Sequence, residues 1–303
     1  MKKKIVISLI LTAALLASCS NAKVETTLTT EDTTAVTTTE ATTTTTTTAE
    51  TKSTTTSETT SGPKPSDPEI KDESETLKRV TFYRDGNPIK AKLYLPEGKG
   101  PFKTVILLGG MYVDLGYYSG KAQIFNDKGY AVVEMSPTNN KLMGVYQIPE
   151  FLGDFVYEQM QDMLSVMDDL KSFPEIDSSD IYLFGHSIGG LGAVYAARER
   201  QDEIKGLILI EPSFQYPETM LFENEETLRK DFYPLLSELK VPVLIVKGTG
   251  DRPDLTDFEH FYDKAIETIP SAKIVTIEGA DHPMHGEPGN QMAESVCENI
   301  KGW

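Results

Sequence analysis

Hydrophobic and polar residues alternate from residue 77 to residue 95, on both sides of the turn sequence Asp85-Gly86-Asn87. Two alternating runs joined by a glycine-containing turn predict an antiparallel hairpin. The later apolar runs are mostly continuous, which is typical of strands buried on both faces of a parallel sheet. We expect these later strands at residues 104–108, 130–135, 181–185, 206–210, 241–247 and 272–277.

Helical patterns separate these strands. The clearest covers residues 154–172, where apolar side chains recur at helical spacing and form one stripe that we expect to pack against the sheet. The stripe comprises Val156, Met160, Met163, Leu164, Met167 and Leu170. Further helices are expected after residue 187 and at residues 117–128, 257–268 and 290–301. Strands that alternate with helices predict an α/β domain over residues 76–303, with a mostly parallel central sheet, helices on both faces and the N-terminal hairpin at one edge.

The first nineteen residues have the pattern of an export signal. Three lysines precede an apolar run from Ile5 to Leu16, which is short for a membrane span but suits a signal peptide. The run ends in Leu16-Ala17-Ser18-Cys19, which resembles a bacterial lipoprotein signal. That resemblance implies a signal peptide at residues 1–18, a lipid on Cys19 and an extracytoplasmic protein anchored at the bacterial cell surface.

Residues 19–75 are rich in threonine and contain no alternating apolar face. Without apolar surface to bury, nothing offsets the entropy lost on ordering, so we expect a disordered tether whose threonines are candidates for O-glycosylation. A flexible coil of about 56 residues has a root-mean-square span of roughly 40 Å. The tether would hold the domain away from the membrane.

Charge and cysteine content limit the kinds of partner that the chain can bind and the disulfides that it can form. The net charge of −17 argues against nucleic acid as a partner. Cys297 is the only cysteine besides Cys19, and it lies among apolar residues at helical spacing. We therefore expect Cys297 to be a small buried hydrophobic residue, with no intramolecular disulfide.

The stretch Ile-Tyr-Leu-Phe-Gly-His-Ser-Ile-Gly-Gly-Leu, residues 181–191, carries the strongest chemical signal. A buried strand, a Gly-x-Ser-x-Gly pentapeptide and a following helix make a nucleophile elbow with Ser187 at its apex. Gly185 and Gly189 let the strand and the helix approach each other closely.

Functional residues of a parallel sheet collect beyond the carboxyl ends of its strands. There the chain places Ser187, Glu211, the sequence Gly248-Thr249-Gly250-Asp251 and the sequence Glu278-Gly279-Ala280-Asp281-His282. A serine nucleophile needs a histidine base, and the histidine needs a carboxylate that fixes its tautomer. Two backbone N–H groups must also face the oxyanion, and the expected donors are Ile188 and Met111.

With these motifs the chain resembles the α/β-hydrolase fold, and within it esterases similar to dienelactone hydrolases and acetyl esterases. The resemblance covers residues 76–303 and includes Gly-His-Ser-Ile-Gly-Gly, Gly-Thr-Gly-Asp and Gly-Ala-Asp-His. Carried over by position, it implies Ser187 as nucleophile, His282 as base and Asp251 as orienting acid. Many relatives have His-Gly where this chain has Gly109-Gly110, which makes Met111 a less secure donor than Ile188.

Rival residues remain at the base and at the acid. His285 lies three residues after His282 and competes as base, while Glu211 competes with Asp251 as acid. His186 should point away from the nucleophile and serve the structure. His260 is expected at the surface, Asp254 at a helix start, and Asp281 beside the histidine but unable to turn back to the same ring.

The expected reaction is hydrolysis of small acyl or aryl carboxylic esters, free or linked to polysaccharide, without a cofactor or a metal. The short cap segment 214–240 cannot enclose a long acyl chain. Its aromatic residues, and those near the oxyanion turn, could line a pocket or anchor their segments, and the sequence favours neither; they are Phe214, Tyr216, Phe222, Phe232, Tyr233, Tyr112, Tyr117 and Tyr118. There are two alternatives. The first is a lipase or peptidase of the same fold, and the second is a surface binding or scaffold protein without catalysis.

Overall fold

A computed structural model describes residues 67–303 apart from residue 112 and the ranges 139–151, 218–231 and 251–258. All described residues belong to one compact unit, Pro65–Trp303. The signal peptide, Cys19 and nearly all of the predicted tether lie outside the described residues. Among the described helices, none has both the length and the apolar character needed to cross a bilayer.

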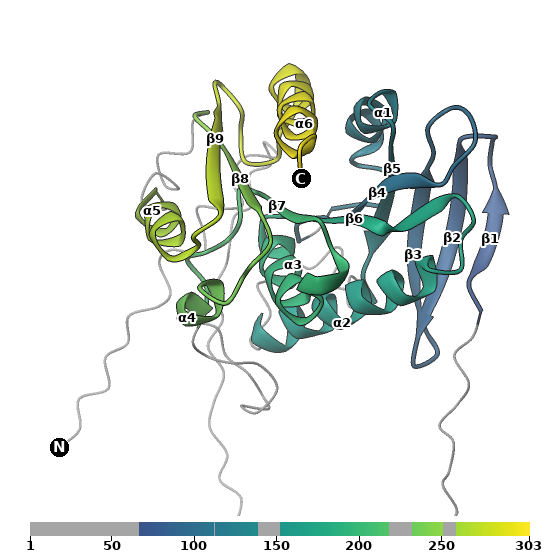
Figure 1. The fold of residues 1–303 in the computed structure, drawn as a ribbon, viewed down its shortest axis with the longest axis horizontal. Coiled ribbons are helices and arrows are strands. Elements are labelled where there is room, and N and C mark those ends of the chain that lie inside the picture. The colour runs from purple at the N-terminus through teal and green to yellow at the C-terminus, as the bar shows by residue number, and fades with distance from the viewer. Residues whose placement is uncertain (1–66, 112, 139–151, 218–231, 251–258) are drawn as a thin grey trace, which may run out of the picture. The chain divides into compact units, whose positions relative to one another are not determined.

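In the described part of the chain, nine strands form a single sheet in the order β1-β2-β3-β5-β4-β6-β7-β8-β9 (Figure 1). The pairs β1/β2, β2/β3 and β3/β5 are antiparallel, and the pairs from β5/β4 to β8/β9 are parallel. The mostly parallel sheet that the hydrophobic pattern predicts is thus confirmed. The strands are β1 (Glu69–Asp72), β2 (Leu77–Arg84), β3 (Asn87–Tyr94), β4 (Phe102–Leu108), β5 (Tyr130–Ser136), β6 (Ile176–His186), β7 (Gly206–Ile210), β8 (Val243–Gly248) and β9 (Ala272–Ile277).

The predicted hairpin is β2 and β3, with Arg84 paired to Asn87 across the turn. Asp85 and Gly86 both have positive φ, 52° and 77°. Two successive residues with positive φ form the turn that matches the twist of a hairpin, and asparagine, aspartate and glycine adopt it most readily. This explains why Asp85-Gly86 marks the turn so clearly in the sequence.

The predicted boundary between tether and domain at residue 75 is wrong by several residues. Residues 69–72 form β1, which pairs with β2 from Glu69 opposite Thr81 to Asp72 opposite Lys78. All four residues of β1 are exposed, and Ile70 keeps 52% of its surface open to solvent. An edge strand this polar buries no apolar face, so it leaves no alternating pattern in the sequence.

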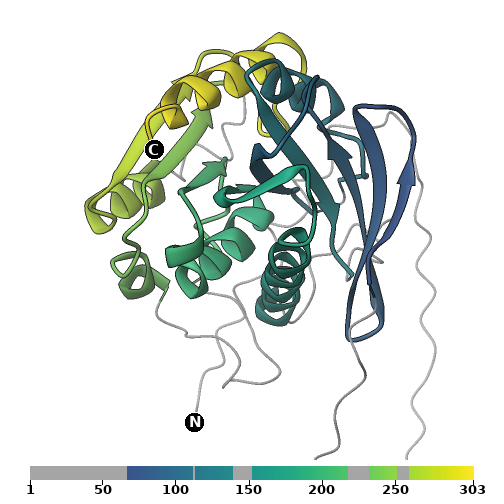
Figure 2. The same cartoon turned by 45° about the vertical axis from the view of Figure 1, so that its right-hand side comes forward.

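Helices cover both faces of the sheet, as predicted (Figures 1 and 2). Helices α1 and α6 lie side by side on one face, and α2 lies beside α3 on the other, with α4 and α5. The helices are α1 (Ser119–Asp127), α2 (Leu152–Leu170), α3 (Ile188–Glu199), α4 (Phe232–Leu236), α5 (Glu259–Thr268) and α6 (Gly286–Ile300), with a short 3-10 helix at Gln201–Glu203.

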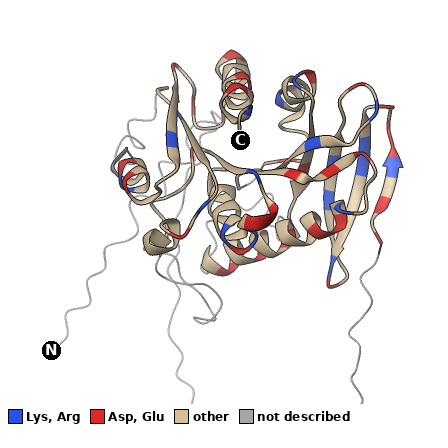
Figure 3. Ribbon diagram, in the orientation of Figure 1, with Lys and Arg blue, Asp and Glu red and all other residues tan. Residues whose placement is uncertain are grey.

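Each face of the sheet has its own hydrophobic core. The core under α2 and α3 contains most of the predicted stripe of α2, including Val156 and Met163, which are fully buried, whereas Leu164 is only partly buried. The core under α1 and α6 contains Phe125 and Cys297. Charged residues are spread over the helices, the loops and the N-terminal strands β1, β2 and β3, whereas β7 carries none (Figure 3). Because the central strands are parallel, their carboxyl ends lie at the same edge of the sheet. The candidate active site lies at this edge.

Candidate active site

Ser187 lies between the last residue of β6 and the first residue of α3, with φ 55° and ψ −124°. A non-glycine residue seldom holds such a positive φ, and the conformation persists only where neighbouring structure fixes it. Here the Ser187 N–H donates to the Ile210 carbonyl at 2.9 Å, and the Ser187 carbonyl accepts from Gly190 and Ser213 at 3.0 and 3.1 Å. Main-chain hydrogen bonds on both sides thus fix the elbow.

The elbow glycines are required by close backbone approaches. A Cβ on Gly185 would lie 2.6 Å from the Gly190 Cα, and a Cβ on Gly189 would collide with the Gly109 carbonyl and lie 2.8 Å from the Leu108 carbonyl. The glycines therefore bring α3 against both its own strand and the end of β4.

The structure brings together Ser187 and His282, two of the three predicted catalytic side chains. His282 lies in the loop after β9, and its Nε2 is 2.9 Å from the Ser187 Oγ. In a neutral ring with Nδ1 protonated, Nε2 accepts the hydroxyl proton, which is the arrangement that activates a serine. The rival base, His285, instead pairs on the surface with Asp281 through its Nδ1 at 2.7 Å.

Asp251, the predicted orienting acid, lies outside the described residues. Its rival Glu211 directly follows β7, has φ 42°, and places Oε2 4.0 Å from the His282 Nδ1. Its Oε1 accepts from the Gly248 N–H at 2.5 Å, and its Oε2 accepts from the Tyr262 hydroxyl at 3.1 Å. Burial raises the pKa of Glu211, and these two hydrogen bonds partly oppose that rise.

Of the two predicted oxyanion donors, Ile188 directly follows Ser187, and Met111 directly follows Gly110, which lies beside Ser187. Ile188 begins α3, and Met111 lies in the turn after β4, where a Cβ on Gly110 would be 3.2 Å from the Ser187 Cβ. Within the described part of the chain, neither the Ile188 N–H nor the Met111 N–H donates a hydrogen bond to another residue. Backbone N–H groups next to a catalytic serine are the usual donors to a developing oxyanion.

Ser213 is a neighbour of Ser187 that the sequence does not single out. Its Oγ lies 3.3 Å from the Ser187 Oγ, and its side chain is buried. Ser213 follows Glu211 and Pro212 in the turn after β7, and a serine in a turn carries no distinguishing pattern of its own. A second hydroxyl therefore contacts the Ser187 hydroxyl.

His186 serves the structure, as expected. It is 3% exposed, its Nδ1 lies 2.5 Å from the Tyr118 hydroxyl and its Nε2 lies 2.7 Å from the His282 carbonyl. Burial, with a smaller effect from His282, lowers the pKa of His186 to about 3. The ring is therefore neutral at physiological pH.

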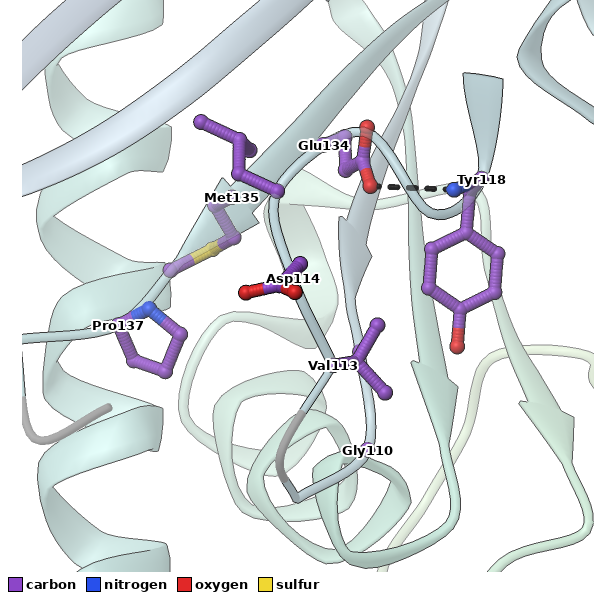
Figure 4. A pocket seen from close by; sticks show the side chains of 9 residues that line it. Gly110, Val113, Asp114, Tyr118, Glu134, Met135 and Pro137 are labelled. Atoms are coloured by element: carbon purple, nitrogen blue, oxygen red, sulfur yellow. Dashed lines mark hydrogen bonds between the residues drawn. The ribbon is translucent and has the colours of Figure 1, made fainter. Parts of the chain in front are cut away.

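Glu134 is a buried carboxylate beside the oxyanion turn, 2% exposed in the middle of β5. Its Oε1 accepts from the Tyr118 N–H at 3.2 Å (Figure 4) and from the Gly116 N–H at 2.8 Å. Its Oε2 accepts from the Tyr94 hydroxyl at 2.9 Å. A single glutamate inside the apolar run Tyr130–Ser136 is the signal that could have identified it. The cavity between Glu134 and Gly110 holds about 10 Å³, which is too small for an acyl group.

The aromatic residues of the cap segment divide between the core and undescribed chain. Phe214, Phe232 and Tyr233 are buried in the core under α2 and α3, which favours the anchoring interpretation for these three. Phe222 and Tyr112 lie outside the described residues. The Tyr117 hydroxyl donates to the Pro283 carbonyl at 2.9 Å, so Tyr117 also anchors a segment.

The remaining sequence candidates are Cys297, His260 and Asp254. Cys297 is 4% exposed, and burial raises the pKa of its thiol to about 12, which keeps it unreactive. His260 lies in α5, and its side chain and Asp254 are outside the described residues. Among the described residues, no group of three His, Cys, Asp or Glu side chains could hold a metal ion.

Comparison with protein families gives a match to the Hydrolase_4 family, described as serine aminopeptidase, S33, over residues 154–234. Two curated relatives are each 24% identical: the acyl-coenzyme A thioesterase 6 of Mus musculus and the 2,6-dihydropseudooxynicotine hydrolase of Paenarthrobacter nicotinovorans. The first match covers 74% of this chain and 50% of the relative, and the second covers 76% and 69%. The chain thus spans only half of the length of the thioesterase that it matches.

Solved structures give the same picture of the fold. Est1E from Butyrivibrio proteoclasticus aligns with TM-score 0.57 and 20% identity, over 74% of this chain and 98% of that one. A dienelactone hydrolase from Anabaena variabilis aligns with TM-score 0.57 and 19% identity, over 78% and 99%. The chain has the α/β-hydrolase fold, and the proteins it resembles support a hydrolase.

Proposed function

We propose that the protein is a serine hydrolase that cleaves carboxylic esters of small acyl or aryl groups through an acyl-enzyme on Ser187. The observation that carries the proposal is the 2.9 Å contact between the His282 Nε2 and the Oγ of a serine held in the strained elbow. A serine with an ordinary hydroxyl needs this base within hydrogen-bond reach to become a nucleophile.

The geometry supports a two-step reaction. The Ser187 Oγ attacks the ester carbonyl carbon as its proton passes to the His282 Nε2, and the backbone N–H groups of Ile188 and Met111 receive the oxyanion. The carbon–oxygen bond to the alcohol then breaks, and His282 returns the proton to the departing alkoxide. In the second step His282 takes a proton from water, the hydroxide attacks the acyl carbon, and the acid leaves as Ser187 regains its proton.

Two carboxylates are proposed as the support of the His282 ring. Asp251 follows β8, the position that the family resemblance implies, and Glu211 follows β7 with its Oε2 4.0 Å from the Nδ1. A carboxylate behind the ring stabilises the imidazolium that forms during attack. Substituting each acid separately, as described in the Discussion, distinguishes them.

For the substrate we propose short acyl or hydroxycinnamoyl esters, free or attached to polysaccharide. The short cap segment supports a lightly covered site, because Phe214, Phe232 and Tyr233 within it pack into the core. Est1E, a structural neighbour at TM-score 0.56, has also been solved with ferulic acid bound. A panel of acetyl, butyryl, long-chain and feruloyl esters would rank these classes by kcat/KM, and a preference for long chains would contradict the proposal.

We further propose that the enzyme works outside the cytoplasm. The pattern at Leu16-Ala17-Ser18-Cys19 supports removal of residues 1–18 and lipidation of Cys19, which would anchor the chain to a membrane. The threonine-rich residues up to 66 would then act as the spacer between the anchor and the hydrolase domain.

A peptidase variant is the second candidate, since the matched family is described as serine aminopeptidase over residues 154–234. That match includes Ser187 but not His282, so it does not extend to the full set of catalytic side chains. Comparing an ester with the matching amide as substrates separates the two: faster turnover of the amide would favour the peptidase.

The proposal is tested by treating the protein with a fluorophosphonate and mapping the adduct. We expect a label on Ser187 and loss of ester hydrolysis by about 10⁴-fold or more in Ser187→Ala. Replacing His282 and His285 by alanine one at a time identifies the base, with activity lost only in His282→Ala. An unlabelled Ser187, or full activity in Ser187→Ala, would mean that the fold is kept here without this catalysis.

A further inference from the structure

Two consecutive carbonyl groups of the loop that carries His282 accept hydrogen bonds from side chains beneath it. His186 places its Nε2 2.7 Å from the His282 carbonyl oxygen, and the Tyr117 hydroxyl lies 2.9 Å from the Pro283 carbonyl oxygen. Both contacts hold the main chain rather than the imidazole ring. The His282 ring is therefore positioned from its own backbone as well as from Ser187.

The chemistry of the partners fixes which atoms donate. A carbonyl oxygen can only accept, so the His186 Nε2 carries a hydrogen and donates it to His282. The buried ring is neutral, because burial lowers its pKa to about 3, and its Nδ1 is therefore an acceptor. The Tyr118 hydroxyl, 2.5 Å from that Nδ1, donates to it. Tyr118 thus selects the tautomer of His186 that can bind the His282 carbonyl.

Tyr118 is itself held rigidly. It is 1% exposed, its N–H donates to Glu134, and its hydroxyl also has a backbone hydrogen bond with Gly110 in the oxyanion turn. Figure 4 shows the Tyr118 nitrogen joined to Glu134 while the hydroxyl points away from that carboxylate, at the far end of the ring. The two ends of Tyr118 therefore connect Glu134 on β5 to His186 in the elbow.

Tyr118 and His186 connect three segments that the proposed reaction must align. Tyr118 follows the turn that carries Met111, His186 immediately precedes the nucleophile, and the carbonyl that accepts from His186 belongs to the base. A displacement of about 1 Å in a catalytic group can cost about 100-fold in rate. A fixed link among the three segments would keep that displacement small.

We propose that Tyr118 and His186 are a positioning pair, which holds the backbone of His282 against the elbow and the oxyanion turn. This inference rests on the proposed hydrolase function, because its consequence is faster turnover at Ser187. Neither residue touches the substrate in this role, so the pair acts by positioning the segments that do.

Four variants test the pair by steady-state ester kinetics. His186→Leu removes both hydrogen bonds, and we expect kcat to fall by about 10- to 100-fold with KM changed less than about twofold. His186→Gln keeps a side-chain N–H that can reach the His282 carbonyl, so most of the loss should be recovered. Tyr118→Phe keeps the ring but removes the hydroxyl, and we expect a fall in kcat of roughly three- to tenfold. The matched control is Tyr195→Phe, because Tyr195 is a buried tyrosine on α3 that packs on Phe232. Its kcat and KM should be unchanged.

Amide hydrogen exchange of residues 278–285 provides a measurement that does not depend on turnover. We expect faster exchange in His186→Leu and Tyr118→Phe and wild-type exchange in Tyr195→Phe. Tyr118→Phe carries the test if His186→Leu fails to fold. Unchanged exchange and unchanged kcat in Tyr118→Phe would overturn the pair even when the wild-type enzyme hydrolyses esters. A wild-type protein without activity would instead refute the proposed function, and loop exchange would still decide whether the pair holds the loop.

Discussion

Ser187 holds a strained backbone conformation, and in that conformation its hydroxyl lies 2.9 Å from the His282 Nε2. A positive φ at a non-glycine residue costs on the order of 1 to 3 kcal/mol. The same is true of Glu211, with φ 42°, so strain occurs at two residues that face the same imidazole. Local strain concentrated around one ring is consistent with a functional role rather than with a packing accident.

Glu211 should destabilise the folded protein at neutral pH. Burial raises its pKa, so above the ordinary glutamate pKa of 4.5 the folded state binds more protons than the unfolded chain. Its contribution to stability is therefore best below pH 4.5 and declines as pH rises through the raised folded pKa. We expect Glu211→Gln to raise the melting temperature at pH 7 and to lose that advantage at pH 4, as measured by calorimetry. An equal change in melting temperature at pH 7 and at pH 4 would contradict this expectation.

The activity of the same variant identifies the acid. If Glu211 supports His282, Glu211→Gln should lower kcat by up to about 10⁴-fold while Asp251→Asn changes it little. The reverse result would establish Asp251, the acid that the family resemblance implies. Near-equal losses in both variants would show that the two carboxylates share the support of the ring.

At the level of single residues, sequence patterns predicted that Ser187 and His282 would lie together, which the structure shows, but not the groups that surround them. Ser187 and His282 were predictable because a nucleophile elbow and a histidine after the last strand have recognisable contexts. Ser213, Glu134 and the Tyr118–His186 contact were not, because each depends on a distance between segments far apart in the chain. The Ser213 hydroxyl stands out only because the fold places it 3.3 Å from the Ser187 Oγ.

Among the elements, the junction of β6, α3 and β4 tolerates the least change. Gly189→Ala would place a Cβ against the Gly109 carbonyl and 2.8 Å from the Leu108 carbonyl, both backbone atoms that cannot rotate away. We expect a loss of about 1 to 3 kcal/mol in the free energy of unfolding, measured by urea denaturation, and at least tenfold lower ester turnover because the oxyanion turn moves.

Gly120→Ala is the matched control for that substitution. Gly120 lies in α1 with nothing within 4 Å of an added Cβ, so alanine should stabilise the helix by about 0.5 to 1 kcal/mol and leave turnover unchanged. A Gly189→Ala variant as stable and active as Gly120→Ala would show that the elbow and β4 do not need their close approach.

Element boundaries were less predictable than element order, for physical reasons that differ along the chain. β6 begins at Ile176, five residues before the predicted strand. The added residues 177–180 are polar and give no apolar run, and the register with β4 shifts between the pairs Phe102–Ile176 and Thr104–Ile181. α6 begins at Gly286 although Pro288 and Gly289 suggest a turn. Proline is compatible with a first helical turn, and Gly289 lets the helix pack closely against Met284.

For the molecule as a whole, the order of elements was predictable because the hydrophobic runs of buried parallel strands are the strongest signal in a sequence. The position of the domain boundary was not, since β1 is polar and exposed and gains its structure only by pairing with β2. The N-terminal residues 1–66 lie outside the described structure, so their proposed role depends on chemistry that can be tested directly.

Substituting Cys19 by serine tests the proposed anchor at the scale of the whole protein. A lipoprotein signal needs the cysteine thiol to carry the lipid, and without it the chain would lose the acyl groups that bind it to a membrane. Expressed in a bacterium that processes lipoproteins, the wild-type protein should sediment with membranes, whereas Cys19→Ser should lose that association. Cys297→Ser, at a buried position, should still sediment with membranes. Fluorophosphonate labelling of Ser187 in each fraction reports whether the hydrolase domain is folded, whichever fraction contains it. A Cys19→Ser protein that stays in the membrane fraction and is labelled normally would refute the proposed anchor. The proposed chemistry at Ser187 would be unaffected by that result.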